Sequence, residues 1–245
     1  MAPESTRERI LDTAEELFAA HGIQGTSLRA LTRRAEVNLA AVHYYFGSKD
    51  GLLDAVVGRR AEALNAERSQ DLERLIGEAS ADGPRAEAIL EAYFRPVIAY
   101  MCEQEARGRQ ATVARLLARI EAEPPDVLGA LIRRHFGELS ARYLEALQAA
   151  LPHLPPEQVA ERFRFAAALL TQLLSGNLEL DVIPGHPPHE ASVTERAQHA
   201  IAFILAGLRS PAIATIALQD DPCKRADAGT DNPALDRLAK RAISQ

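Results

Sequence analysis

Residues 26–52 read TSLRALTRRAEVNLAAVHYYFGSKDGL, and this stretch decides the fold of the N-terminal part of the chain. Two short segments with helical periodicity each follow a residue that caps helices: Thr26 or Ser27 precedes the first segment, and Asn38 precedes the second, at residues 39–46. Two short capped helices joined by three residues have the dimensions of a helix-turn-helix, whose second helix enters the major groove of DNA.

Helical periodicity divides residues 39–46 into an inward and an outward face. Val42 and Phe46 lie one turn apart, so they should pack into the core of the module. The remaining side chains point outward, where they would meet the edges of bases. The predicted base contacts are Leu39, Ala40, His43 and Tyr44.

Phosphate contacts are expected from the residues around this second helix. Lys49 lies in the first turn of the next helix, where free N–H groups and the helix dipole already favour an anion. Arg29 and Arg33 offer cations on the first helix, although a solvated helix face also needs such charges. With the base contacts, the predicted DNA-binding set is Thr26, Ser27, Arg29, Arg33, Asn38, Leu39, Ala40, His43, Tyr44 and Lys49.

Two phrases of this stretch, TSLRAL at 26–31 and VHYYFGSKDGL at 42–52, resemble the signature of the TetR/AcrR family of transcriptional regulators. The resemblance implies a three-helix DNA-binding domain, a larger helical domain that dimerises and binds a small molecule, and a palindromic operator released on ligand binding. The sequence departs from the family at Glu36, where a glycine is usual, and a left-handed non-glycine residue costs about 1 kcal/mol. The phrase VNLAAV at 37–42 is also similar to the fatty-acid-responsive, PsrA-like subset.

The rest of the chain has the composition and periodicity of helices, so we expect an all-α fold. The 245 residues are 47% hydrophobic, which is enough for a sizeable core, and prolines fall between the periodic segments. Helices are expected near residues 85–107, 109–122, 126–151, 156–181 and 193–208. The predicted domains are a helix-turn-helix domain at 1–50, a helical ligand-binding and dimerisation domain at 51–209, and a loosely ordered tail at 210–245.

Charge is distributed unevenly along the chain. The formal net charge is −6, yet residues 26–49 carry four Arg or Lys against one acid, Glu36. A DNA-facing module attached to an acidic body would show this asymmetry, and so would an ordinary solvated face.

Two C-terminal segments, at 156–181 and 193–208, are apolar on more than one face. Such helices suit either the core of one subunit or a four-helix bundle between two subunits. The resemblance favours the bundle, because a homodimer doubles the contacts with a palindromic site. The predicted interface residues are Leu169, Leu170, Leu173, Leu174, Ala197, Ala200, Ile201, Ile204 and Leu205.

A ligand pocket is expected among the central helices, although most of its candidate side chains would also serve as ordinary core. Their composition favours an apolar or aromatic effector, including an acyl chain if the PsrA-like similarity holds. Arg95, Arg115 or Arg164 would meet a carboxylate or phosphate on it. The predicted pocket residues are Tyr93, Phe94, Val97, Met101, Leu117, Tyr143, Phe163 and Asn177.

Other classes of protein find little support in the sequence. It contains no catalytic or nucleotide-binding motif, and we expect no enzyme activity and no cofactor. Its two cysteines form no CxxC pair, and His186 with His189 lacks a third ligand, so no metal site is predicted. Without a signal peptide or a membrane span, we expect a cytoplasmic protein. The alternative function is a helical small-molecule-binding or interaction protein in which Glu36 has weakened DNA binding.

Overall fold

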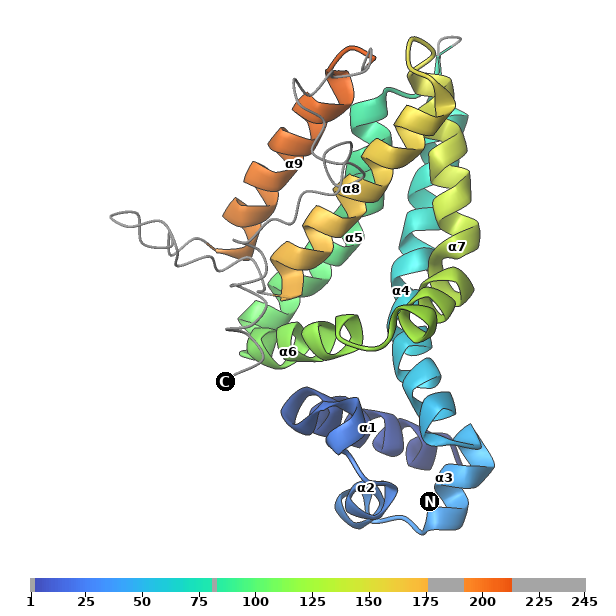
Figure 1. Ribbon diagram of the computed structural model, residues 1–245, viewed down its shortest axis with the longest axis vertical. Coiled ribbons are helices and arrows are strands. Elements are labelled where there is room, and N and C mark those ends of the chain that lie inside the picture. Colours follow the sequence, from blue (N-terminus) through green and yellow to red (C-terminus); the bar gives the residue numbers. More distant parts are fainter. Residues whose placement is uncertain (1–2, 81–82, 176–191, 213–245) are drawn as a thin grey trace, which may run out of the picture. The chain divides into compact units, whose positions relative to one another are not determined.

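The computed structural model describes residues 3–80, 83–175 and 192–212, and within them the chain is all-helical, as predicted (Figure 1). The first four helices are α1 (Pro3–Gly25), α2 (Leu28–Ala35), α3 (Leu39–Phe46) and α4 (Lys49–Glu78). The others are α5 (Ala86–Ala106), α6 (Gln110–Glu121), α7 (Pro125–Ala150), α8 (Pro156–Ser175) and α9 (Val193–Arg209). No helix in these ranges is long and apolar enough to cross a membrane.

Two compact units make up the chain, residues 1–210 and 211–245, and all nine described helices belong to the first. Helix α4 runs without a break across residue 50, where the sequence predicted a domain boundary. The predicted end of the long C-terminal helix, residues 176–181, lies outside the described residues, as does nearly all of the predicted tail. His186 and His189 also lie outside them.

Side-chain caps set the helix starts around the turn motif. Ser27 Oγ accepts a hydrogen bond from Ala30 N at 3.1 Å, and Asn38 Oδ1 accepts one from Ala41 N at 2.8 Å. These bonds satisfy N–H groups that have no partner within a helix, which is why the chain changes direction at both residues. Ser48 caps α4 in the same way, through Gly51 N at 3.0 Å.

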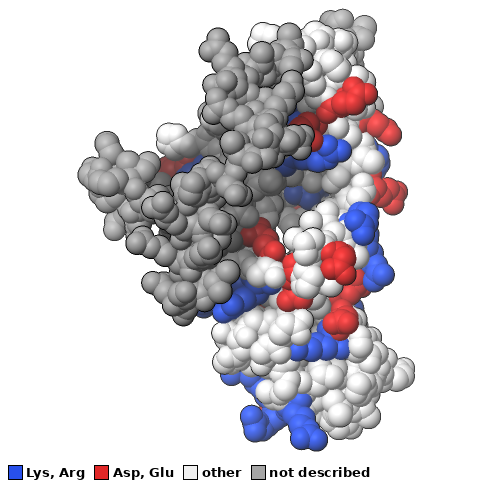
Figure 2. Space-filling view, in the orientation of Figure 1, with Lys and Arg blue, Asp and Glu red and all other residues white. Residues whose placement is uncertain are grey.

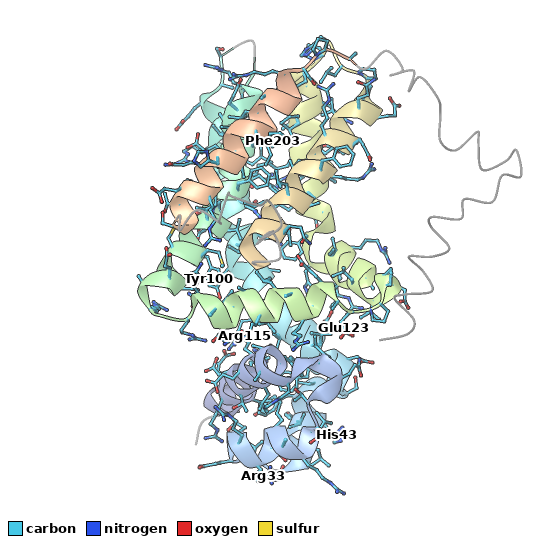
Figure 3. The ribbon with its side chains drawn as sticks, turned by 60° about the vertical axis from the view of Figure 1, so that its left-hand side comes forward. Arg33, His43, Tyr100, Arg115, Glu123 and Phe203 are labelled. Carbon is cyan, nitrogen blue, oxygen red and sulfur yellow. The ribbon has the colours of Figure 1, made fainter. Side chains whose placement is uncertain are left out.

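The N-terminal core is built from α1–α4, and two buried side chains from the helical body, which we define as α5–α9 with the C-terminal part of α4, complete it. Ile10, Phe18 and Val42 are completely buried in it. Leu116 of α6 and Leu131 of α7 belong to the same cluster. The module formed by α1–α4 therefore shares its core with the helical body, because α6 lies against α1 (Figure 3).

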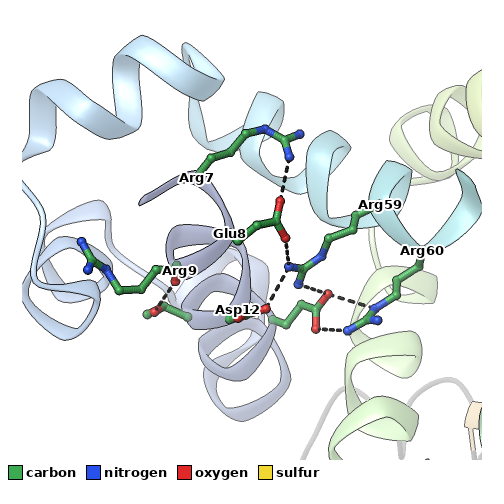
Figure 4. A network of polar contacts seen from close by, with 8 residues as sticks. Arg7, Glu8, Arg9, Asp12, Arg59 and Arg60 are labelled. Atoms are coloured by element: carbon green, nitrogen blue, oxygen red, sulfur yellow. Dashed lines mark hydrogen bonds and ion pairs between the residues drawn. The ribbon is translucent and has the colours of Figure 1, made fainter. Parts of the chain in front are cut away.

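A network of ion pairs also ties α1 to α4 (Figure 4). Arg59 contacts Glu8 and Asp12 at 2.8 Å each and Glu15 at 2.5 Å, while Arg60 contacts the second oxygen of Glu15 at 2.7 Å. The Glu15 carboxylate is nearly buried, which strengthens these pairs relative to exposed ones. Arg60 also lies over the Tyr100 ring of α5, 5.4 Å from its centroid, and so links α1 to the body.

The core of the body is formed by α4, α5, α7, α8 and α9 around a group of aromatic rings. Tyr93 lies at its centre and meets Phe94, Tyr143 and Phe163 edge to face, with ring centroids 4.9 to 5.3 Å apart. Aromatic pairs in this geometry contribute beyond the area they bury. The Tyr93 hydroxyl is 3.0 Å from Ser140 Oγ, which gives the cluster one polar contact.

Candidate nucleic-acid interface

Helix α3 presents the face that the sequence predicted. Val42 and Phe46 are buried, at 0% and 9% exposure. On the other side Tyr44 is 83% exposed and Leu39 is 43% exposed, and Ala40 and His43 are exposed as well. The Tyr44 ring meets the Tyr45 ring edge to face, with centroids 5.1 Å apart, but most of its surface stays in solvent and is available for contact with another molecule.

The turn before α3 contains the left-handed residue that the sequence indicated. Glu36 has φ 51° and ψ 47°, and its N–H donates to Thr32 O, which closes the C-terminus of α2. Among the described residues it is the only non-glycine residue with a positive φ. The turn therefore adopts a left-handed conformation with a side chain that disfavours it, and Glu36 is exposed.

The structure corrects the role of Thr26. This residue is 3% exposed, and its hydroxyl donates to Leu17 O at 3.1 Å and to Gly22 O at 2.8 Å. Its N–H donates to Ile23 O, so neither group is free for a phosphate. Gly22 has non-helical angles, φ 76° and ψ 164°, which leaves carbonyls without helical partners. Thr26 therefore binds the end of α1 instead of DNA.

Cations surround the exposed face of α2. Arg34 is paired with Glu16 of α1 at 2.6 Å, whereas Arg29 and Arg33 form no ion pair among the described residues. On the face shown in Figure 2, Lys and Arg side chains gather at the end formed by α1–α3. Arg33 and His43 lie at this same end (Figure 3). A groove of about 300 Å³ between α1 and α2 is lined by Leu17, His21, Gly25, Thr26, Ala30, Arg33 and Arg34.

His43 has one ring nitrogen engaged and one free for contact. Nδ1 lies 2.8 Å from Gly47 O, and a carbonyl oxygen can only accept, so Nδ1 carries the proton. In the neutral ring Nε2 is then an acceptor, which matches the amino group of adenine or cytosine in the major groove. Sequence periodicity predicted that this side chain faces outward but not which atom it presents.

Lys49 and the cap residues have partners within the protein but keep spare donors. Lys49 Nζ donates to Gln24 O at 3.1 Å, so it closes the end of α1. An ammonium has three N–H groups, and two remain for a phosphate. Ser27 and Asn38 use their oxygen atoms as acceptors in capping, which leaves the hydroxyl hydrogen and the amide Nδ2 as donors.

Most of the predicted pocket residues come together in the core of the body. Tyr93, Phe94, Met101, Tyr143 and Phe163 are buried in one cluster. Val97 and Leu117 are partly buried against it, and Asn177 lies outside the described residues. Arg95, Arg115 and Arg164 are exposed, and Arg95 is paired with the buried Asp71, so a charged contact from one of them stays a prediction.

The predicted dimer residues divide into buried and partly exposed side chains. Leu170, Ala197, Ala200 and Ile204 are 4 to 7% exposed and pack inside their own subunit. Leu169, Ile201 and Leu205 are partly buried against the same core, and the side chains of Leu173 and Leu174 lie outside the description. Among the described side chains of α8 and α9, the large apolar ones that are exposed are Phe165, at 64%, and Phe203, at 74%.

Comparison with known proteins bears on both parts of the chain. Residues 10–56 match the model of bacterial regulatory proteins of the tetR family. Residues 91–207 match the C-terminal domain of tetracyclin repressor-like proteins. The two matches together include the turn motif and most of the helical body. These families consist of transcriptional regulators and not of enzymes.

Individual relatives are similar over different extents. The probable HTH-type regulator YttP of Bacillus subtilis is 38% identical over 61 residues, which are 25% of this chain and 30% of YttP, so the chain spans less than a third of that relative. The regulator BetI of Burkholderia thailandensis is 25% identical over 211 residues, 83% of this chain and 95% of BetI.

A solved structure supports the architecture of the whole first unit. The fatty acid degradation regulator FadR of Bacillus halodurans has a TM-score of 0.57 and 15% identity, and the alignment covers 83% of this chain and 96% of that one. At this identity the similarity concerns the fold alone. The two family matches, the turn motif with its caps and the shared all-helical architecture lead to one conclusion: the chain belongs to the TetR family of transcriptional regulators.

Proposed function

We propose that this protein is a dimeric, ligand-released repressor that binds a palindromic operator through α3. The observation that carries the proposal is the outward face of α3, where Tyr44 is 83% exposed beside Leu39. The small side chain of Ala40 would allow the helix to approach the floor of the major groove. Arg29 and Arg33 on α2 and Lys49 on α4 flank this face and would bind the phosphates. Catalysis has no part in this function.

DNA binding is tested by fluorescence anisotropy with the intergenic DNA upstream of the protein's own gene. Tyr44→Ala and Arg33→Ala should both weaken binding without unfolding the protein. Because Arg33 would contact a phosphate, its loss should also lower the slope of log affinity against log salt by about 1 per site. The matched control is Arg133→Ala, an exposed arginine on α7, which should leave affinity and slope unchanged.

The results separate this function from its alternative. Normal operator affinity in both Tyr44→Ala and Arg33→Ala would overturn the assignment of the interface. Absence of salt-sensitive, palindrome-dependent binding by the wild-type protein would instead favour a helical small-molecule-binding or interaction protein. Replacing Lys49 is less informative, because its ammonium also binds Gln24 O and the change would disturb α1.

We infer that two subunits associate through the exposed face of α8 and α9. Exposed residues recur at helical spacing on α8, at Phe165 and Ala168, and on α9, at His199, Phe203 and Ala206. The two helices pack side by side, and Phe203 is visible on α9 in Figure 3. An isologous interface would bury both phenylalanines and would place two copies of α3 on one side of the dimer. Half-sites would then be about 34–36 Å apart.

A further inference from the structure

The core of the body contains a buried cation that the proposed DNA interface does not use. Arg68 of α4 is 5% exposed, and its guanidinium carbon lies 4.1 Å from the centroid of the Tyr93 ring. Its Nε donates to Tyr93 O at 2.8 Å. The Tyr143 hydroxyl in turn donates to Arg68 O at 2.7 Å, which holds the α4 backbone against α7.

No carboxylate among the described residues pairs with Arg68. Asp71, three residues later in α4, is also buried, but Arg74 contacts one of its oxygens at 2.6 Å and Arg95 contacts the other. Burial lowers the pKa of Arg68, because desolvation disfavours the cation, and the tyrosine phenols oppose this effect only in part. A carbonyl and an aromatic face compensate a buried charge less well than an anion does.

We propose that Arg68 recognises the charge of the effector, and that the effector carries a carboxylate joined to an apolar group. A guanidinium binds a carboxylate through two parallel N–H···O bonds, and no existing ion pair of Arg68 would have to be broken. The apolar part would pack beside Tyr93, which lies over the guanidinium and meets Tyr143 and Phe163 edge to face. The proposal rests on the function above, since it names the ligand class of that regulator.

The ligand class is tested by isothermal titration calorimetry with two pairs of probes: decanoate with 1-decanol, and 4-phenylbutyrate with 4-phenyl-1-butanol. The wild-type protein should bind at least one carboxylate about 10- to 100-fold more tightly than the matching alcohol, the usual effect of a hydrogen bond to a charged group. Arg68→Gln should abolish this preference and leave alcohol binding unchanged. The matched control is Arg142→Gln on α7, which removes an exposed guanidinium from the same helix pair and should keep the preference.

The proposal is overturned if the wild-type protein binds neither carboxylate, if it binds them no better than the alcohols, or if Arg68→Gln keeps the preference. Should Arg68→Gln fail to fold, Arg68→Lys decides the matter. Lysine keeps the positive charge but lacks the planar guanidinium, so this variant should bind the carboxylate more weakly and still prefer it to the alcohol. Unchanged carboxylate affinity in Arg68→Lys would contradict the proposal. Operator binding by the ligand-free protein is measured separately, so a failure of DNA binding is distinguishable from a failure of carboxylate recognition.

Discussion

Glu36 has an unfavourable backbone conformation and an acidic side chain in the turn before α3. Glycine adopts φ 51° without strain, so Glu36→Gly should raise the free energy of unfolding by about 0.5–1 kcal/mol. It should also tighten operator binding, because a carboxylate near the DNA is removed. Urea denaturation and anisotropy measure the two effects.

Glu36→Gln separates the two contributions of this residue. It keeps the backbone strain and removes the charge, so it should tighten DNA binding without the gain in stability. If neither variant binds DNA more tightly, Glu36 points away from the phosphates. If Glu36→Gly is no more stable than Glu36→Gln, the left-handed conformation carries no strain.

Thr26 stabilises the end of α1, so its loss should affect folding and not DNA recognition. Thr26→Val keeps the shape of the side chain but leaves Leu17 O and Gly22 O without the hydroxyl donor. The free energy of unfolding should fall by about 1–3 kcal/mol, while the affinity of the folded fraction for the operator stays the same. Ser27→Ala is the comparison variant, because it changes the neighbouring hydroxyl residue, which is exposed and caps α2. If Thr26→Val has normal stability but binds DNA weakly, the predicted phosphate contact of Thr26 is supported instead.

The hydrogen bond from the Tyr143 hydroxyl of α7 to Arg68 O of α4 predicts that the free energy of unfolding falls at alkaline pH. Burial raises the pKa of Tyr143 to about 12, and the nearby Asp71 carboxylate adds to the shift. In the unfolded chain tyrosine has a pKa of about 10. The phenol therefore ionises first in the unfolded state, so its contribution is complete below about pH 10 and is lost as the pH rises toward 12.

Chemical denaturation of the wild type and of Tyr143→Phe between pH 8 and pH 11 tests this expectation. The phenylalanine variant should be less stable by about 1 kcal/mol at pH 8, because its hydrogen bond to Arg68 O is lost. The difference should shrink above pH 10. Two curves that stay parallel through pH 11 would contradict the assignment.

The helices themselves could be predicted from the sequence, because local chemistry sets their ends. The structure confirms the cap predicted at Asn38, and Ser48 and the box formed by Ser192 with Glu195 follow the same spacing of three residues. The orientation of α8 and α9 could not be predicted. Both helices are apolar on several faces, and periodicity gives the angle between two residues without saying which one meets the neighbouring helix.

Arg68 shows the same limit in the candidate site. It stands between Glu67 and Asp71 in a charged segment of the kind that usually faces water. Only the packing of α5 and α7 against α4 reveals that Arg68 and Asp71 are turned inward. The outward residues of α3 were easier to predict, because Val42 and Phe46 fix one buried face and Leu39, Ala40, His43 and Tyr44 lie away from it.

At the scale of the whole molecule, association should depend on the two exposed phenylalanines. Phe203→Glu and Phe165→Glu place charges where an apolar interface would form, so each should shift the protein to a monomer in sedimentation velocity and weaken operator binding. Ile76→Glu is the matched control, since Ile76 is an exposed apolar residue of α4, and this variant should remain dimeric. A dimeric Phe203→Glu protein would show that subunits meet elsewhere.

One continuous helix carries both Lys49, beside the proposed DNA surface, and Arg68, in the core of the body. At 1.5 Å per residue the two lie about 29 Å apart along the axis of α4. A lever of that length converts a tilt of about 5° at Arg68 into a displacement of about 2.5 Å at Lys49. In the proposed dimer, opposite movements of the two subunits would change the separation of their α3 helices by about 5 Å. The expected half-site spacing is about 34–36 Å. In the proposed repressor, a tilt of about 5° on effector binding would therefore be enough to misalign the two α3 helices with the operator.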